Sequence, residues 1–182
     1  MKNYAELLLK NESYRKYVSC LAELEKERKF CHHDKKHFIE VASLASWAAS
    51  ICRVPHEPQL IMLAALLHDI GRVHGSEHHA KASIGIAKEL MLQLRVPEDL
   101  QIRVVDLIEA HTIKDDRRNA IKTYDQLRDA LKELDEVDRL VYIFAWADNR
   151  VRQCFACDAA GECYWDDRRK NMEPINYEVF KI

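Results

Sequence analysis

The sequence contains little glycine or proline, no long apolar run and almost no excess of one charge. Four glycines and four prolines in 182 residues leave few residues for the turns of a β-rich fold. No stretch approaches the roughly 18–20 apolar residues of a membrane helix, and the charged N-terminus has no apolar region suited to a signal peptide. The formal net charge of −2 provides no overall attraction to nucleic acids or anionic membranes. We therefore expect a cytoplasmic protein without a membrane or nucleic-acid partner, whose oligomeric state the sequence does not indicate.

Residues that favour helices are abundant, and apolar side chains recur at spacings of three or four. The length suits one domain over residues 1–182. Between the predicted helices, residues 114–119 read as a polar loop, and Ser76 is a candidate N-cap. The pattern predicts a compact all-α bundle of six to seven helices, at about residues 7–24, 33–52, 60–70, 77–94, 98–111, 121–134 and 135–155.

The segment AALLHDIGR (64–72) places a histidine and an aspartate at the end of an apolar run. Both His68 and Asp69 are costly to bury unless a partner satisfies them. His37 lies near the start of a predicted helix and Asp148 lies late in the last one, so both can be partners. Two imidazoles and two carboxylates suit a catalytic divalent transition metal with positions left open for water or substrate. Spacing alone leaves the alternative that these are ordinary surface or core side chains.

Three segments in this order, HFIEVA (37–42), LLHDIGR (66–72) and WADNR (146–150), resemble the HD-domain superfamily of metal-dependent phosphohydrolases. The resemblance covers roughly residues 30–152, and Arg72 departs from the lysine that is common after the His-Asp pair. It implies a helical bundle of the HD-domain type, followed by a cysteine-containing tail at residues 153–182. It also implies that a divalent transition metal (Mn, Fe, Ni, Co or Zn) binds to His37, His68, Asp69 and Asp148.

Two further segments resemble those that supply a second metal site in binuclear members of the superfamily. His79 opens the segment HAKASIGIAKEL (79–90), and His111 closes the segment IEAH (108–111). Thr112 stands where a second histidine is frequent, so this second set is present only in part. The two histidines can bind a second ion, orient water or contact phosphate, and they can equally be surface or capping residues.

The resemblance implies hydrolysis of a nucleotide or another small phosphate ester by a metal-activated water. Asp69 would hold the metal, and in a binuclear site it would bridge both ions. Arg72 is the first candidate to contact the phosphate, ahead of Lys114 and Arg150. His111 is the best candidate for a general acid. One alternative is a non-catalytic metal-binding or redox-sensing regulatory module on the same fold. Another is a di-iron oxygenase, which Thr112 makes less favourable.

The cysteines suggest a second metal site. In a reducing compartment, thiols serve more often as metal ligands or buried side chains than as disulfides. Cys154, Cys157 and Cys163 form a C-x2-C-x5-C pattern. Cys31 precedes His37 by six residues and Cys154 follows Asp148 by six, a displacement of about 9 Å along each helix, so antiparallel helices would bring them together.

We therefore predict a four-thiolate site for zinc or an iron–sulfur cluster. His32 or His33 can replace Cys31 as the fourth ligand, and free thiols without a metal remain an alternative. Cys20 and Cys52 are predicted to be core residues.

Overall fold

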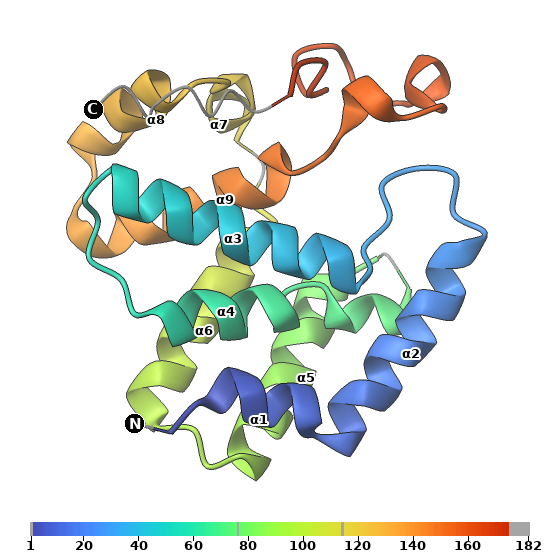
Figure 1. Cartoon of the computed structure of the whole chain (residues 1–182), viewed down its shortest axis with the longest axis vertical. Helices are drawn as coiled ribbons and strands as arrows, with labels where there is room; N and C mark the ends of the chain where they lie inside the picture. The colour runs from blue at the N-terminus through green and yellow to red at the C-terminus, as the bar shows by residue number, and fades with distance from the viewer. Residues whose placement is uncertain (1, 76, 114, 175–182) are drawn as a thin grey trace.

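The computed structural model describes residues 2–75, 77–113 and 115–174, which fold into helices joined by short connections (Figure 1). No strand occurs among these described residues, which confirms the predicted all-α class. Short 3-10 turns are η1 (Ile70–His74), η2 (Leu131–Glu133), η3 (Cys154–Ala156) and η4 (Ala160–Glu162). The α-helices are α1 (Tyr4–Lys10), α2 (Glu12–Lys26), α3 (Lys35–Ile51), α4 (Pro58–Leu67), α5 (His79–Gln93), α6 (Glu98–Ala110), α7 (Asp116–Ala120), α8 (Tyr124–Ala130) and α9 (Glu136–Arg150).

The described part of the chain has more and shorter helices than the periodicity predicts. The first predicted helix is divided at Asn11, whose side chain caps α2 by accepting a hydrogen bond from Tyr14 N (3.0 Å). The segment predicted as a polar loop contains α7 instead, because Asp115 accepts hydrogen bonds from the backbone N–H groups of Arg117 and Arg118. The last core helix ends at Arg150 rather than near residue 155. The predicted N-cap Ser76 lies outside the described residues.

The apolar helix α4 forms the centre of the bundle (Figure 1). It packs against α1, α3 and α6, and seven of its ten residues are buried. Full burial of a leucine or isoleucine side chain contributes about 1.5–3 kcal/mol, so this helix is a large part of the stabilising core. The hydroxyl group of Tyr14 in α2 donates a hydrogen bond to the Leu66 carbonyl (3.2 Å) and fixes the C-terminal end of α4. The His-Asp pair therefore follows a rigid element.

A cluster of buried apolar side chains runs from Ala5 in α1 to Val151 after α9. The helix α9 packs against both α3 and α6. No helix in the described residues is long and apolar enough to cross a membrane. Cys20 is exposed on α2, so the prediction that it is a core residue is wrong, and Cys52 at the end of α3 is only partly buried.

Candidate metal centre

Helix ends position the four side chains that the sequence predicts as metal ligands. Asp34 caps α3 by accepting a hydrogen bond from the backbone N–H of His37 (3.1 Å), and this places His37 in the first turn. His68 is the C-cap of α4, and Asp69 follows it directly. Asp148 lies in the last turn of α9, which packs against α3. Three helices thus deliver these side chains to one place.

The imidazole rings of His37 and His68 face each other, with the carboxylate of Asp148 beside both. Their Nε2 atoms are 3.3 Å apart. Oδ1 of Asp148 lies 3.1 Å from Nε2 of His37 and 3.5 Å from Nε2 of His68. Oδ2 of Asp69 lies 3.5 Å from Nε2 of His68. Two imidazoles and two carboxylates therefore converge in a geometry that a single divalent ion can occupy.

A second group of potential ligands lies on the other side of Asp69. Nε2 of His79 is 3.2 Å from Oδ1 of Asp69, and Nε2 of His111 is 3.6 Å from the same oxygen. The ligand atoms of these three residues lie within 4.8 Å of one another, as do those of His37, His68 and Asp69. Asp69 belongs to both groups, and each of its carboxylate oxygens faces one of them.

A close backbone approach at Gly71 brings His79 to Asp69. A Cβ atom at this position would lie 2.3 Å from the carbonyl oxygen of His79 and 2.3 Å from the backbone nitrogen of Ser83. The N–H of Gly71 also donates a hydrogen bond to the Ser83 hydroxyl (2.8 Å). Only glycine allows η1 and the first turn of α5 to pack at this distance, and His79 is in that turn.

The histidine tautomers and an unsatisfied buried atom fit a bound cation. Nδ1 of His68 lies 2.8 Å from the Ala65 carbonyl oxygen, and Nδ1 of His111 is hydrogen bonded to the Ile108 carbonyl. Because each ring carries its proton on Nδ1, each Nε2 offers its lone pair to the centre. Nε2 of His111 is buried and forms no hydrogen bond with described residues, and a metal ion would satisfy such an atom. Oδ1 of Asp69 is already paired with Nε of Arg72 at 2.8 Å.

Both carboxylates are ionised without a metal. Burial opposes ionisation of Asp69, but the neighbouring imidazoles and Arg72 hold its pKa well below its usual range. Burial likewise opposes the charge of Asp148, and the adjacent His37 and His68 hold its pKa well below its usual range. Burial also disfavours a charged His68, yet Asp69 and Asp148 raise its pKa. The two ionised carboxylates therefore supply negative charge for a cation, and Arg72 offsets part of it.

The structure adds a fifth histidine that the sequence pattern did not assign to this centre. Nε2 of His33 lies 3.7 Å from Oδ2 of Asp69. The buried carboxylate of Glu25 accepts a hydrogen bond from the backbone N–H of His33 (2.8 Å) and lies 3.4 Å from its Nδ1. A carboxylate on the far nitrogen orients a histidine toward a metal. The ring of His33 is thus directed toward the candidate metal centre. It is not oriented to replace Cys31 as the fourth ligand of the predicted thiolate site.

The centre opens into a large pocket with a volume of about 1180 Å³. Arg72 lines it, with Nε 2.8 Å from Oδ1 of Asp69. Arg118 of α7 also lines it and is buried, although the sequence indicated a solvated segment there. Its Nε forms no hydrogen bond with described residues. Arg118 is therefore an additional guanidinium group facing the pocket.

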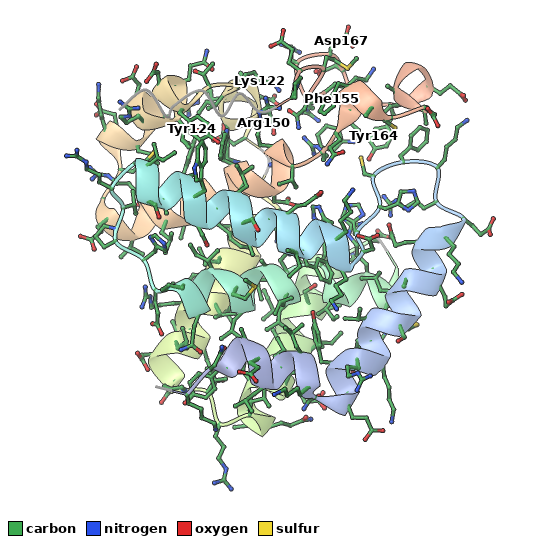
Figure 2. The ribbon with its side chains drawn as sticks, viewed as in Figure 1. Lys122, Tyr124, Arg150, Phe155, Tyr164 and Asp167 are labelled. Carbon is green, nitrogen blue, oxygen red and sulfur yellow. The ribbon has the colours of Figure 1, made fainter. Side chains whose placement is uncertain are left out.

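Of the other two candidates for phosphate binding, only Arg150 is among the described residues. The Arg150 guanidinium donates to the carbonyl oxygens of Glu173 and Pro174, and it is not among the pocket-lining residues. Figure 2 shows this side chain close to Lys122. Lys114 lies outside the described residues. The four cysteines of the predicted thiolate site do line the pocket.

Comparisons with known proteins agree with this geometry. The model of the HD-domain family matches residues 35–152, which is more than half of the chain. A protein of Clostridium beijerinckii, named only as an uncharacterized protein, is 29% identical over 169 residues. The match covers 91% of this chain and 94% of that protein. No solved structure matches the chain. The family match includes all four predicted ligands of the first group, and the chain belongs to the HD-domain family.

Proposed function

We propose that this protein is a metal-dependent phosphohydrolase that holds two divalent cations and acts on a nucleotide or another small phosphate ester. HD-domain proteins belong to a superfamily of metal-dependent phosphohydrolases. The observation that carries the proposal is the position of Asp69, whose two carboxylate oxygens face two separate groups of imidazoles. The pocket beside the centre is large enough for a substrate of nucleotide size.

The two ligand groups have different compositions and hence different roles. His37, His68, Asp69 and Asp148 would hold the first cation, because they form the more complete set. Asp69, His79 and His111 would hold the second, whereas His33 lies on the side of the first group, near Oδ2 of Asp69. A bound divalent cation would supply Lewis acidity and would lower the pKa of a water molecule bound to it to about 7. Since Nδ1 of His111 is already bonded to a carbonyl, its Nε2 is better placed to bind metal than to act as a general acid.

Arginine side chains of the pocket would bind and orient the phosphate. Arg72 is held by Asp69 at the edge of the centre, so its remaining N–H groups can reach a phosphate oxygen without losing position. Arg118 is fixed by a hydrogen bond to the Ile113 carbonyl. Fixed donors of this kind stabilise the charge that develops on phosphate oxygens, because they need no reorganisation during the reaction.

The experiment that tests this proposal measures phosphate release from a panel of nucleotides and simple phosphate esters. The purified chain is assayed with Mn²⁺, with Zn²⁺ and with a chelator. We expect metal-dependent release from at least one class of ester, and no release in the chelator. Metal binding without release from any ester would contradict the enzymatic proposal and favour a regulatory module on the same fold.

Replacing Arg72 with glutamine should lower kcat/KM by about a hundredfold, as expected for the loss of one positioned donor. The amount of bound metal should not change, because the metal ligands remain. The comparison is with Arg103→Gln, which changes an arginine on the surface of α6. Equal kcat/KM values for the two variants would exclude Arg72 from phosphate binding.

Replacing Glu25 with glutamine should weaken metal binding by about 10- to 100-fold, because the partner that orients His33 loses its charge. A titration of the metal-free protein with Mn²⁺ measures this affinity. Glu23→Gln serves as the control, since Glu23 is exposed on the same helix and pairs only with Lys26 among the described residues. An unchanged affinity in Glu25→Gln would mean that His33 does not contribute to the centre.

A further inference from the structure

Four cysteines from two distant segments lie around the same pocket as the metal centre. Cys31 is in the loop between α2 and α3, and Cys154, Cys157 and Cys163 follow α9. All four line the pocket, whereas Cys20 and Cys52 do not. Burial raises the pKa of the Cys31 thiol, Arg152 lowers it, and the nearby Cys154 and Cys163 raise it further. The fold thus brings together thiols that are more than 120 positions apart in the sequence.

Contacts on both sides of the cysteines hold the two segments against each other. Lys29 forms an ion pair with Glu162, next to Cys163. Phe30 packs edge-to-face on Tyr164, with ring centroids 6.3 Å apart, and Tyr164 is labelled beside this loop in Figure 2. The residues that precede Cys31 therefore contact the residues on either side of Cys163. Two independent contacts fix the register of the loop against the tail.

The segment after α9 has little apolar burial of its own. Among the described residues 151–174, the buried apolar side chains are only Val151 and Ala159, and the aromatic rings of Phe155 and Tyr164 are exposed. Its regular structure consists of the short turns η3 and η4. Hydrophobic burial is the main stabilising term in most folds. Because this segment buries so few apolar side chains, hydrophobic burial explains little of its order. Hydrogen bonds from the buried Asn171 to the carbonyl groups of Asn149, Arg150 and Arg152 hold part of the segment. A metal centre that cross-links the segment to Cys31 would add to this stabilisation.

The backbone of Cys31 is strained in a way that is common at functional sites. Its φ angle is +36°, in the left-handed region that residues with side chains rarely adopt. Such strain persists where the surrounding structure fixes the residue, and it is concentrated at binding sites. The loop conformation thus directs Cys31 into the pocket wall at a cost that a bound group would offset.

We propose that Cys31, Cys154, Cys157 and Cys163 bind an iron–sulfur cluster in the wall of the substrate pocket. A single zinc ion with Zn–S bonds of about 2.3 Å needs sulfur atoms about 3.8 Å apart. Among the described residues, groups of three or more ligand atoms within 4.8 Å occur only at the HD centre, so no three cysteine sulfurs approach that closely. A [4Fe–4S] cluster binds one thiolate on each of its four irons, and so it accepts a wider spacing.

The test is to purify the full chain without oxygen and to measure iron and acid-labile sulfide. Sulfide is the decisive quantity, because iron at the histidine and aspartate centre carries none. We expect about four sulfides per chain and a broad visible absorption that bleaches on reduction. Cys31→Ala and Cys163→Ala should each lose the sulfide, and the matched Cys20→Ala should keep it. Asp69→Asn should also keep it, so this proposal can succeed where the phosphohydrolase proposal fails.

Two results would overturn the cluster. One is the presence of zinc, in place of iron and sulfide, bound to the four thiols. The other is the absence of sulfide both after anaerobic purification and after reconstitution of the wild-type chain with ferrous iron and sulfide. Both results come from the wild-type protein, so a cysteine variant that fails to fold does not leave the question open.

Discussion

Replacing Asp69 with asparagine should lower metal-dependent phosphate release by about a thousandfold or more, since the loss of a shared ligand removes several kcal/mol of transition-state stabilisation. Asparagine keeps the size of the side chain but not its charge, and only one of its two terminal atoms accepts a metal bond. Each of the two imidazole groups would lose part of its ligand set, because each faces one oxygen of Asp69. Both cations should therefore bind more weakly.

The control for this experiment is Asp106→Asn, which changes an exposed aspartate on α6. Its activity should equal that of the wild type. Circular dichroism of both variants would show whether the helical fold is kept. If Asp69→Asn is folded and as active as Asp106→Asn, the activity does not arise at this centre.

Replacing Gly71 with alanine should lower the free energy of unfolding by about 3 kcal/mol, the upper part of the range for overpacking in a tight core. The added methyl group would lie 2.3 Å from two backbone atoms of α5, so the helix itself must move. Because His79 is in the first turn of that helix, the movement also separates His79 from Asp69. Urea denaturation measures the stability, and metal titration measures the effect on the second cation.

The chain provides a matched control in Gly85, which is exposed in the middle of α5 and has no atom within 4 Å of an added Cβ. Gly85→Ala should stabilise the protein by about 0.5–1 kcal/mol, because alanine favours the helix more than glycine does. The two substitutions are chemically identical, so their opposite effects would isolate the close approach at Gly71. Similar stabilities for both variants would contradict the packing described between η1 and α5.

Local sequence patterns predicted the elements that carry the four expected ligands. The apolar run before His68 and the helical pattern that contains His37 depend on neighbours in the chain, and these signals are readable from the sequence alone. The shared position of Asp69 depends on how η1 packs against α5, which is a tertiary contact. The sequence could suggest two metal sites but could not show which oxygen faces which histidine.

The residues that were missed or misplaced depend on loops and on the tail. His33 precedes the helix, and only its contacts with Glu25 and Asp69 reveal a role. Arg118 was assigned to a solvated loop, because a single turn capped by Asp115 gives no periodic signal. Arg150 lies two residues after the Asp148 ligand, yet its guanidinium donates hydrogen bonds to the carbonyl oxygens of Glu173 and Pro174 in the tail. The direction of a long side chain is set by its partners and not by its sequence position.

The central claim is that Asp69 joins two cation sites, and equilibrium dialysis of the metal-free protein against Mn²⁺ tests it most directly. Mn²⁺ suits carboxylate ligands and is a poor match for soft thiolates, so the cysteines should not add to the count. The account predicts two Mn²⁺ ions per chain in the wild type, one for each ligand group, and at most one weakly bound ion in Asp69→Asn. A wild-type protein that binds no Mn²⁺, or an Asp69→Asn variant that binds two as tightly as the wild type, would contradict it.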